Sequence, residues 1–278
     1  MRSKCRILLF LVLLQMSSSL IPTVKSAPPT EGLDGVGVNT TCQAVGCVAQ
    51  LLTTSKGHDV IIIAADCTVL GCCLWNNQLL RPVCSTVPSI KDSSGLVFNR
   101  RASTNASLVE YYATADGPLR SDNITLVFPN IFGIYAAPYQ YCPLADRGGV
   151  FCPVQVLAVH FASGQVFDPN PSVPATVSWS ECVGACVRYC VSECSLSIQT
   201  SRQDLVIAIV SMPDAFACGG PTPPYPHNVP GFTTLTGGPR GAVFEIDYVV
   251  TGPQSTVVFT CSGTLVDSII IDAIPLKG

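Results

Sequence analysis

The even set of cysteines in the body of the chain most constrains what it can fold into. The sequence contains 15 cysteines, and setting aside Cys5, which lies in the basic segment at the N-terminus, leaves 14. An even number of cysteines in a secreted chain is typical of a disulfide framework. The spacing does not determine which cysteines pair. The expected half-cystines are Cys42, Cys47, Cys67, Cys72, Cys73, Cys84, Cys142, Cys152, Cys182, Cys186, Cys190, Cys194, Cys218 and Cys261.

Residues 1–26 have the layout of a secretory signal peptide. Three basic residues precede the apolar run Ile7–Leu14, and small residues follow, up to Ser26 and Ala27. The run is shorter than the ~20 apolar residues that span a bilayer. We therefore expect cleavage between residues 19 and 27, with Ser26 favoured, and a secreted, extracellular product without a membrane span. An uncleaved anchor is the alternative.

The low charge of the chain limits the classes of partner that it can bind. Charged residues make up 12% of the sequence, and removing the four basic residues of 1–26 takes the net charge from −3 to −7. A negative surface with few basic residues argues against nucleic acid, heparin or an anionic membrane as a partner. An extracellular protein or a glycan is the expected partner.

Three intact sequons predict N-glycosylation. They are Asn39-Thr40-Thr41, Asn105-Ala106-Ser107 and Asn123-Ile124-Thr125. Sequons also occur by chance, so unused asparagines are the alternative. In a chain with a signal peptide, we expect Asn39, Asn105 and Asn123 to carry glycan.

The fold class expected from these patterns is mainly β (α+β), with antiparallel, disulfide-stapled sheets and one helix near 178–194. We divide the mature chain into a cysteine-containing β-rich region, 27–153, and a C-terminal region, 154–278. Short runs of apolar and β-branched residues between turn-forming residues predict the strands. The principal candidates are Asp59–Cys67, Ile124–Phe128, Val154–Phe161, Leu205–Val210, Val243–Val250, Thr256–Cys261 and Ser268–Ile274.

The predicted helix begins with a capping box, Ser178-Trp179-Ser180-Glu181. In this motif the serine hydroxyl and the glutamate carboxylate each accept a hydrogen bond from the other residue's amide. Four cysteines follow at four-residue intervals and would form one slowly winding stripe on the helix. Since their Cβ vectors are parallel, we expect their disulfide partners on neighbouring strands.

The adjacent Cys72 and Cys73 would point to opposite faces of a strand. They then need separate partners, as two structural half-cystines. The alternative is a strained vicinal disulfide that acts as a redox switch.

One short internal echo links the two regions. Thr54-Ser55-Lys56 precedes an apolar run that begins at Asp59, and Thr200-Ser201-Arg202 precedes one that begins at Asp204. The echo indicates either a duplicated module or the chance recurrence of a short β-prone string.

Residues 154–250 resemble the PAN-3 (CW) modules of secreted nematode proteins, a branch of the PAN/apple group. The matching features are the apolar strand Val156–Val159 with Gly164, the Trp179-Ser180-Glu181-Cys182 segment with Cys186, and Gly241 followed by 242–246. The chain departs from the family by adding Cys190 and Cys194, and by Glu245 where lysine is common. The resemblance implies a twisted antiparallel sheet with one helix stapled across it, and contacts with protein or carbohydrate without catalysis.

Residues suited to catalysis or metal binding are sparse. His58, His160 and His227 are isolated from one another, and no G-x-S-x-G motif occurs. Zinc coordination by the cysteine stripe is an alternative, but structural zinc sites bring together two short knuckles from separate segments. We therefore expect no catalytic, cofactor-binding or metal-binding residue, and no cofactor. Carboxylates that are distant in sequence but meet in space would be an exception.

Two functions from different classes follow. The first is an extracellular module that binds protein or carbohydrate, and it is the one we favour. The second is a structural, disulfide-linked glycoprotein of a matrix, cuticle or envelope.

Overall fold

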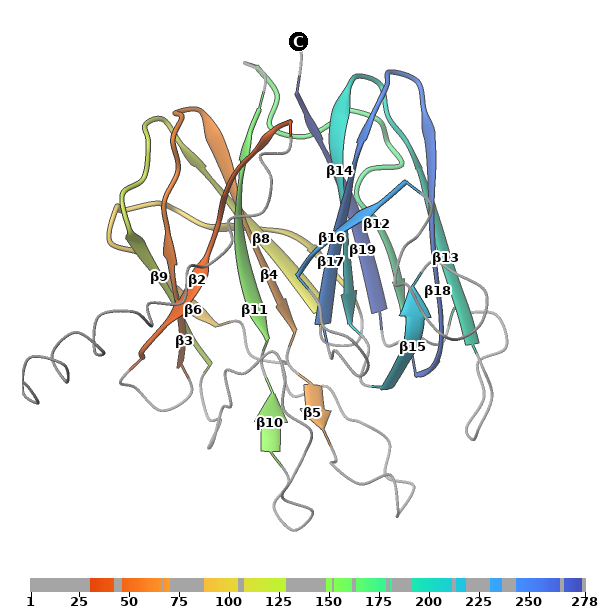
Figure 1. The fold of residues 1–278 in the computed structure, drawn as a ribbon, viewed down its shortest axis with the longest axis horizontal. Coiled ribbons are helices and arrows are strands. Elements are labelled where there is room, and N and C mark those ends of the chain that lie inside the picture. The colour runs from red at the N-terminus through yellow and green to blue at the C-terminus, as the bar shows by residue number, and fades with distance from the viewer. Residues whose placement is uncertain are drawn as a thin grey trace, which may run out of the picture.

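The computed structural model shows an antiparallel, mainly β protein (Figure 1), which confirms the fold class. The seven principal strand predictions each overlap an observed strand. No α-helix occurs within the ranges that the structure describes. Those ranges are 31–42, 47–66, 68–70, 88–104, 108–128, 149–151, 153–161, 164–178, 181, 192–211, 214–218, 231–236, 244–265 and 268–276.

The first half of the chain forms a sandwich of two sheets. Its inner sheet has the strand order β1-β11-β4-β8-β7, with bounds Leu33–Val36, Val154–His160, Asp59–Asp66, Leu108–Ala115 and Asn99–Ser103. Its outer sheet has the order β2-β3-β9-β6, with bounds Val38–Thr40, Cys47–Leu52, Asp122–Val127 and Ser89–Lys91. Apolar side chains of β3, β4, β8, β9 and β11 fill the space between the sheets. The pair β5 (Thr68–Leu70) and β10 (Gly149–Phe151) forms a separate ribbon.

The second half forms another sandwich. Its inner sheet has the order β12-β19-β14-β17-β16, with bounds Ala175–Ser178, Ser268–Pro275, Asp204–Ser211, Phe244–Thr251 and Thr233–Thr236. Its outer sheet has the order β13-β18-β15, with bounds Ser192–Gln199, Thr256–Leu265 and Asp214–Cys218. The core between these sheets includes Phe232 and Phe259, whose rings meet edge to face.

The two inner sheets pack against each other, so the molecule has four layers of sheet (Figure 1). Side chains of β4, β8 and β11 meet those of β14, β17 and β19 in a third apolar core. Strands β4, β14 and β19 are therefore covered on both faces, and every residue in them is buried. This explains why their sequences are almost continuously apolar, whereas the outer-sheet strand β9 alternates buried with more exposed residues.

The two sandwiches have the same topology. The inner-sheet orders correspond strand by strand, and the outer-sheet order β3-β9-β6 corresponds to β13-β18-β15. Strands β4 and β14 are both eight residues long. Over its whole length, β4 pairs with β8, and β14 pairs in the same way with β17. The echo of Thr54-Ser55-Lys56 in Thr200-Ser201-Arg202 thus marks equivalent turns, β3–β4 and β13–β14.

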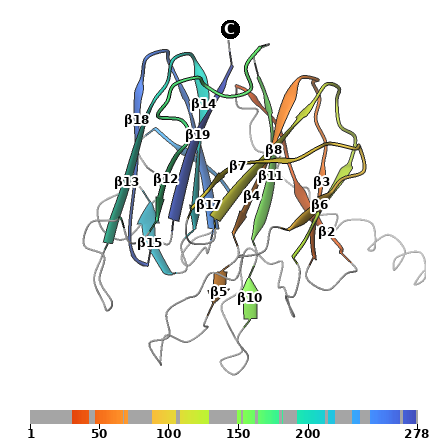
Figure 2. The same ribbon diagram turned by 180° about the vertical axis from the view of Figure 1, so that it is seen from behind.

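Polar groups join the inner sheets at two places. The Ser211 hydroxyl donates to the Asp66 carboxylate, and these residues occupy the same final position of β14 and β4. On one flank, Arg101 forms a two-pronged ion pair with the buried Asp272, through Nε to Oδ2 at 2.7 Å and a second nitrogen to Oδ1 at 3.1 Å. Figure 2 shows β7, which carries Arg101, at the junction of the two inner sheets.

The same flank holds a second buried acid, Glu110 of β8. On the other flank, the register places Ile246 at the position equivalent to Glu110, and Leu157 at the position equivalent to Asp272. The interface is therefore polar on one flank and apolar on the other, although the backbone topology is repeated.

The helix predicted over 178–194 is wrong at both ends. Ser178 is the last residue of β12, and Ser192–Cys194 belong to β13; residues 182–191 lie outside the described part of the chain. One half of the capping contact exists, because the Ser178 amide donates to Glu181 Oε2 at 2.7 Å. From Cys194 onward, buried Cys194 and Ile198 alternate with exposed serines, which is the two-residue period of a strand.

The predicted boundary at residue 153/154 also differs from the structure. Strand β11, Val154–His160, pairs with β1 and β4 and so completes the first sandwich rather than starting the second. The segments that carry the PAN-3 resemblance are divided accordingly: β11 lies in the first inner sheet and β17 in the second. The resemblance itself stays a hypothesis.

Candidate functional site

Four turns gather at one end of the two sandwiches, at the top of Figure 1. They connect inner to outer sheets: β3 to β4 (53–58), β8 to β9 (116–121), β13 to β14 (200–203) and β17 to β18 (252–255). We call this set of residues the turn end. Loops held by a rigid scaffold are frequent sites of binding and catalysis, so the turn end is the candidate functional site.

A buried threonine ties the turns of each sandwich together. The Thr54 amide donates to the Leu119 carbonyl at 3.0 Å, and the Leu119 amide donates back to Thr54 Oγ1 at 2.9 Å. The second sandwich repeats both bonds. The Thr200 amide donates to the Ser255 carbonyl at 2.9 Å, and the Ser255 amide donates to Thr200 Oγ1 at 3.3 Å. These bonds fix the relative positions of two turns in each sandwich.

An aspartate also holds each threonine-bearing turn from the side. Asp34 of β1 accepts bonds from the Ser55 amide at 2.9 Å and the Lys56 amide at 2.7 Å, as well as from the Ser55 hydroxyl. Partial burial would raise the pKa of Asp34, but these hydrogen bonds outweigh it and lower the pKa. Asp168 acts in the same way in the second sandwich, where Oδ2 accepts from the Ser201 amide at 2.7 Å. The hydrogen bonds to Asp168 likewise lower its pKa against the effect of burial.

A second, fully buried aspartate begins β4 and β14 beneath these turns. Burial raises the pKa of Asp59 to about 6, and the charge of Asp34 adds to this effect. Burial raises the pKa of Asp204 to about 7, and its contact with Asp168 adds to it. Each sandwich therefore holds a pair of carboxyl groups whose pKa values are moved in opposite directions.

The two pairs differ in one neighbour. His160, opposite Asp59 in the β11–β4 register, places Nδ1 3.4 Å from Asp59 Oδ1, and 37% of its side chain is exposed. Pro275 occupies the corresponding position opposite Asp204. The sequence placed His160 in an apolar strand but did not indicate this acidic partner.

Acid pairs of this kind, formed by carboxylates distant in sequence, serve in some enzymes as general acid and base. Here Asp59 and Asp204 have no exposed surface, so a substrate atom cannot reach either carboxyl group. Both pairs instead support the turns above them. Their duplication points to the same structural role in the two sandwiches.

The pKa of Asp204 leads to a pH prediction. Between about pH 4 and pH 7 the folded protein keeps a proton on Asp204, whereas the unfolded chain, in which this carboxyl has its ordinary pKa of 3.8, releases it. The contribution of Asp204 to stability is therefore fully present below about pH 4. It is lost as the pH rises toward about 7. We expect the Asp204→Asn variant, whose neutral amide can still donate to Asp168, to lose less stability over this range. Denaturant unfolding at a series of pH values measures the stability of both proteins. If stability depends on pH in the same way in Asp204→Asn and in wild type, the raised pKa is contradicted.

The backbone at the turn end adopts an uncommon conformation. Within the described ranges, the non-glycine residues with positive φ are His58 (60°), Ser121 (51°) and Gln254 (53°). All three are exposed, and all three lie in these turns. Such conformations cost free energy and persist where the surrounding structure enforces them, often at sites of function.

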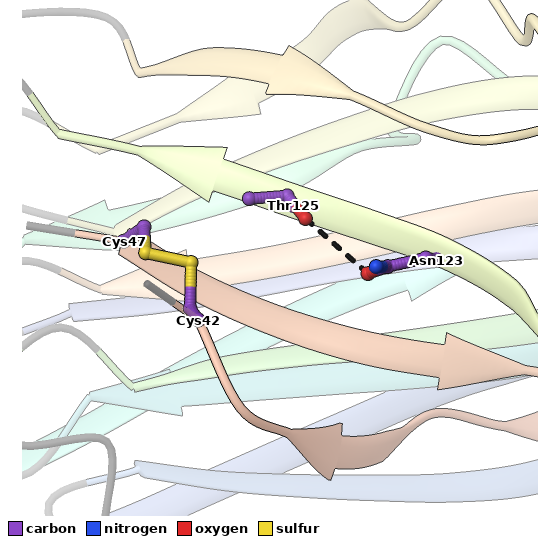
Figure 3. The surroundings of a disulfide bond; sticks show 4 residues. All are labelled: Cys42, Cys47, Asn123 and Thr125. Carbon is purple, nitrogen blue, oxygen red and sulfur yellow. Dashed lines mark hydrogen bonds between the residues drawn. A yellow bond between two sulfur atoms is a disulfide. The ribbon is translucent and has the colours of Figure 1, made fainter. Parts of the chain in front are cut away.

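The predicted glycosylation sites have different positions. Asn123, on β9, is exposed, and the Thr125 hydroxyl donates to its Oδ1 at 3.3 Å (Figure 3). Asn39, on the edge strand β2, is exposed too, but its Oδ1 accepts from Gln50 Nε2 at 2.8 Å. Asn105 lies outside the described ranges, as does His227.

Of the predicted half-cystines, Cys42 and Cys47 form a disulfide (Figure 3). Cys194 and Cys261 are each disulfide-bonded and buried, and they are register partners across β13 and β18. Cys218, on β15, is also in register with Cys261. The side chains of the other predicted half-cystines lie outside the described ranges: Cys67, Cys72, Cys73, Cys84, Cys142, Cys152, Cys182, Cys186 and Cys190.

The described part of the chain has neither a cluster suited to a metal ion nor a membrane-spanning helix. It contains no group of three or more His, Cys, Asp or Glu side chains arranged to hold a metal ion. It also contains no helix long and apolar enough to cross a membrane.

No family model, no curated protein and no solved structure matches this chain.

Proposed function

We propose that this chain is a secreted glycoprotein that binds an extracellular protein or carbohydrate, and that the turn end is its binding surface. The observation that carries the proposal is the repeated bracing of the turns by Thr54 with Asp34 and by Thr200 with Asp168. Bracing of this kind keeps exposed turns in one conformation before a partner arrives. Preorganisation lowers the entropic cost of binding.

The composition of the turn end supports binding over catalysis. Its exposed residues are small or polar, with both signs of charge, as in Lys56, Asp116 and Arg120. Its strongly shifted carboxyl groups are buried below the surface. A mixed polar surface on a rigid frame fits recognition of a polar partner by hydrogen bonds and charge complementarity.

A binding screen with matched charge reversals tests the proposal. We would present the secreted protein to arrays of extracellular proteins and oligosaccharides, and measure retention and turnover. The Lys56→Glu/Arg120→Glu variant changes two exposed residues of the turn end, whereas Lys91→Glu/Arg100→Glu makes the same charge change at exposed residues of β6 and β7. We expect the turn-end variant to bind at least about tenfold more weakly, and the control to bind like wild type.

Equal weakening by both variants would place the binding surface elsewhere. Turnover of a ligand that is lost when one acid is changed to its amide would overturn the binding function. Absence of saturable retention, with sedimentation as a disulfide-linked assembly, would favour the structural glycoprotein instead.

A further inference from the structure

A row of three side chains crosses the outer face of the first outer sheet. Val38 of β2 is the register partner of Leu51 of β3, and Leu51 is the register partner of Asn123 of β9. Residues directly opposite each other in antiparallel strands point to the same face, with Cβ atoms about 5 Å apart. Their face is the solvent side, because the alternate residues Val48, Leu52 and Ile124 fill the core.

The two apolar members of this row are unusually exposed. Val38 is 56% exposed and Leu51 is 37% exposed, and they are adjacent. The other large hydrophobic side chains exposed to this degree within the described ranges, Val97 and Val258, belong to other parts of the molecule. Single exposed apolar residues are ordinary, but adjacent ones form an apolar patch, and such patches are commonly covered by another group.

The third member of the row is the acceptor asparagine of a sequon. The Asn123 backbone is held in place, since its amide donates to the Ser93 hydroxyl at 2.9 Å, while its side chain is exposed. Thr125, two residues along β9, points to the same face, and its hydroxyl reaches Asn123 Oδ1. The sequon and the apolar patch therefore share one surface.

We propose that an N-linked glycan on Asn123 lies across Leu51 and Val38 and shields this patch from water. Two strand spacings amount to about 10 Å, a length that the first two N-acetylglucosamine residues span. The C–H faces of these sugars supply the apolar contact, and their hydroxyl groups stay in water. The inference rests on the secreted-glycoprotein part of the proposed function and assigns that glycan a structural role.

The attachment reaction uses a lipid-pyrophosphate-linked oligosaccharide as donor. The amide nitrogen of Asn123 forms a bond to C1 of the first N-acetylglucosamine, and the bond from C1 to the pyrophosphate oxygen breaks. The lipid pyrophosphate leaves with the electron pair, and the amide nitrogen loses one proton.

The neighbouring sequon does not fit this role. Asn39 is the register partner of Gln50, whose side chain is buried on the core side of the sheet, and the two side chains are hydrogen-bonded. A glycan on Asn39 would start from the opposite side of the row. Asn39→Gln is therefore the matched control for Asn123→Gln.

Hydroxyl-radical footprinting with mass spectrometry reads the exposure of the individual side chains. We expect labelling of Leu51 and Val38 to rise about twofold in Asn123→Gln, because a bulky group is then absent. Labelling of Val97 and Val258 stays constant, and Asn39→Gln leaves all four unchanged. Trimming the glycans of the folded wild-type protein to a single sugar provides a test without mutation, in which we expect Val38 to become more exposed.

The outcomes separate the two proposals. A secreted protein with no glycan on any sequon overturns the glycoprotein part of the proposed function. Glycan at Asn39 or Asn105 but not at Asn123 overturns only the shield. An occupied Asn123 whose loss or trimming leaves the labelling of Leu51 and Val38 unchanged also overturns the shield.

Discussion

Replacing Arg101 with alanine is expected to lower the free energy of unfolding by about 3–5 kcal/mol, the cost of leaving a buried charge without its partner. Asp272 has no exposed side-chain surface, and Arg101 is its ion-pair partner at 2.7 Å. Burial raises the pKa of Asp272, while the guanidinium of Arg101 opposes that rise. Without Arg101, the carboxyl group must bind a proton or remain charged and buried without a cation beside it.

Two neighbours increase the expected cost. Burial, together with the charge of Asp272, raises the pKa of Glu110 well above its ordinary value, so removing Arg101 leaves two acids facing each other. The Arg101 guanidinium also lies 4.0 Å from the centre of the Phe167 ring, and this cation–π contact would be lost.

Denaturant unfolding measures the effect, with Arg100→Ala as control. Arg100 is the preceding residue on β7 and is exposed, so its removal should change the stability by less than about 0.5 kcal/mol. We expect the Arg101→Ala/Asp272→Asn double variant to recover part of the loss, because the buried charge is then gone. Equal stability of Arg101→Ala and Arg100→Ala would show that the ion pair contributes nothing.

The second large effect is expected at the cysteines of the second sandwich. Replacing either Cys194 or Cys261 with serine should cost about 2–5 kcal/mol, the usual range for loss of a native disulfide. Both residues are disulfide-bonded and lie in the core between the second inner and outer sheets. Each substitution also places a hydroxyl group among apolar side chains, next to a free thiol.

Secreted yield and unfolding under non-reducing conditions measure this loss. Ser197→Ala is the control, because Ser197 lies on the same strand as Cys194 but is exposed on the outer face. Near-wild-type yield and stability of both cysteine variants would show that these bonds do not support the sandwich.

The sequence predicted the strands well for a physical reason. Runs such as Asp59–Asp66 and Asp204–Ser211 are covered on both faces, so nearly every residue is apolar and the strand is recognisable without periodicity. The turns before these two strands have similar sequences, and Thr54 and Thr200 make equivalent contacts with the backbone in them. The same contacts in the two sandwiches account for the sequence similarity.

The errors have physical causes too. The four-residue spacing of cysteines predicts a helix, whereas the alternation from Cys194 to Ile198 is the pattern of a strand and forms part of β13. Asp34 and Asp168 were not predicted, because they act on turns 22 and 33 residues away, and no local pattern marks those contacts. The partner of His160 was missed likewise, since pairing of β11 with β4 joins segments about 100 residues apart.

The one-sided polarity of the interface between the inner sheets determines which sandwiches can associate. Two copies of the first sandwich would bring Glu110 and Arg101 against Leu157, with no Asp272 to receive the guanidinium. Two copies of the second would bury Asp272 against Ile246 without an arginine. Each sandwich is thus complementary to the other and mismatched with itself. The tandem arrangement in one polypeptide supplies the two unlike halves in a fixed one-to-one ratio.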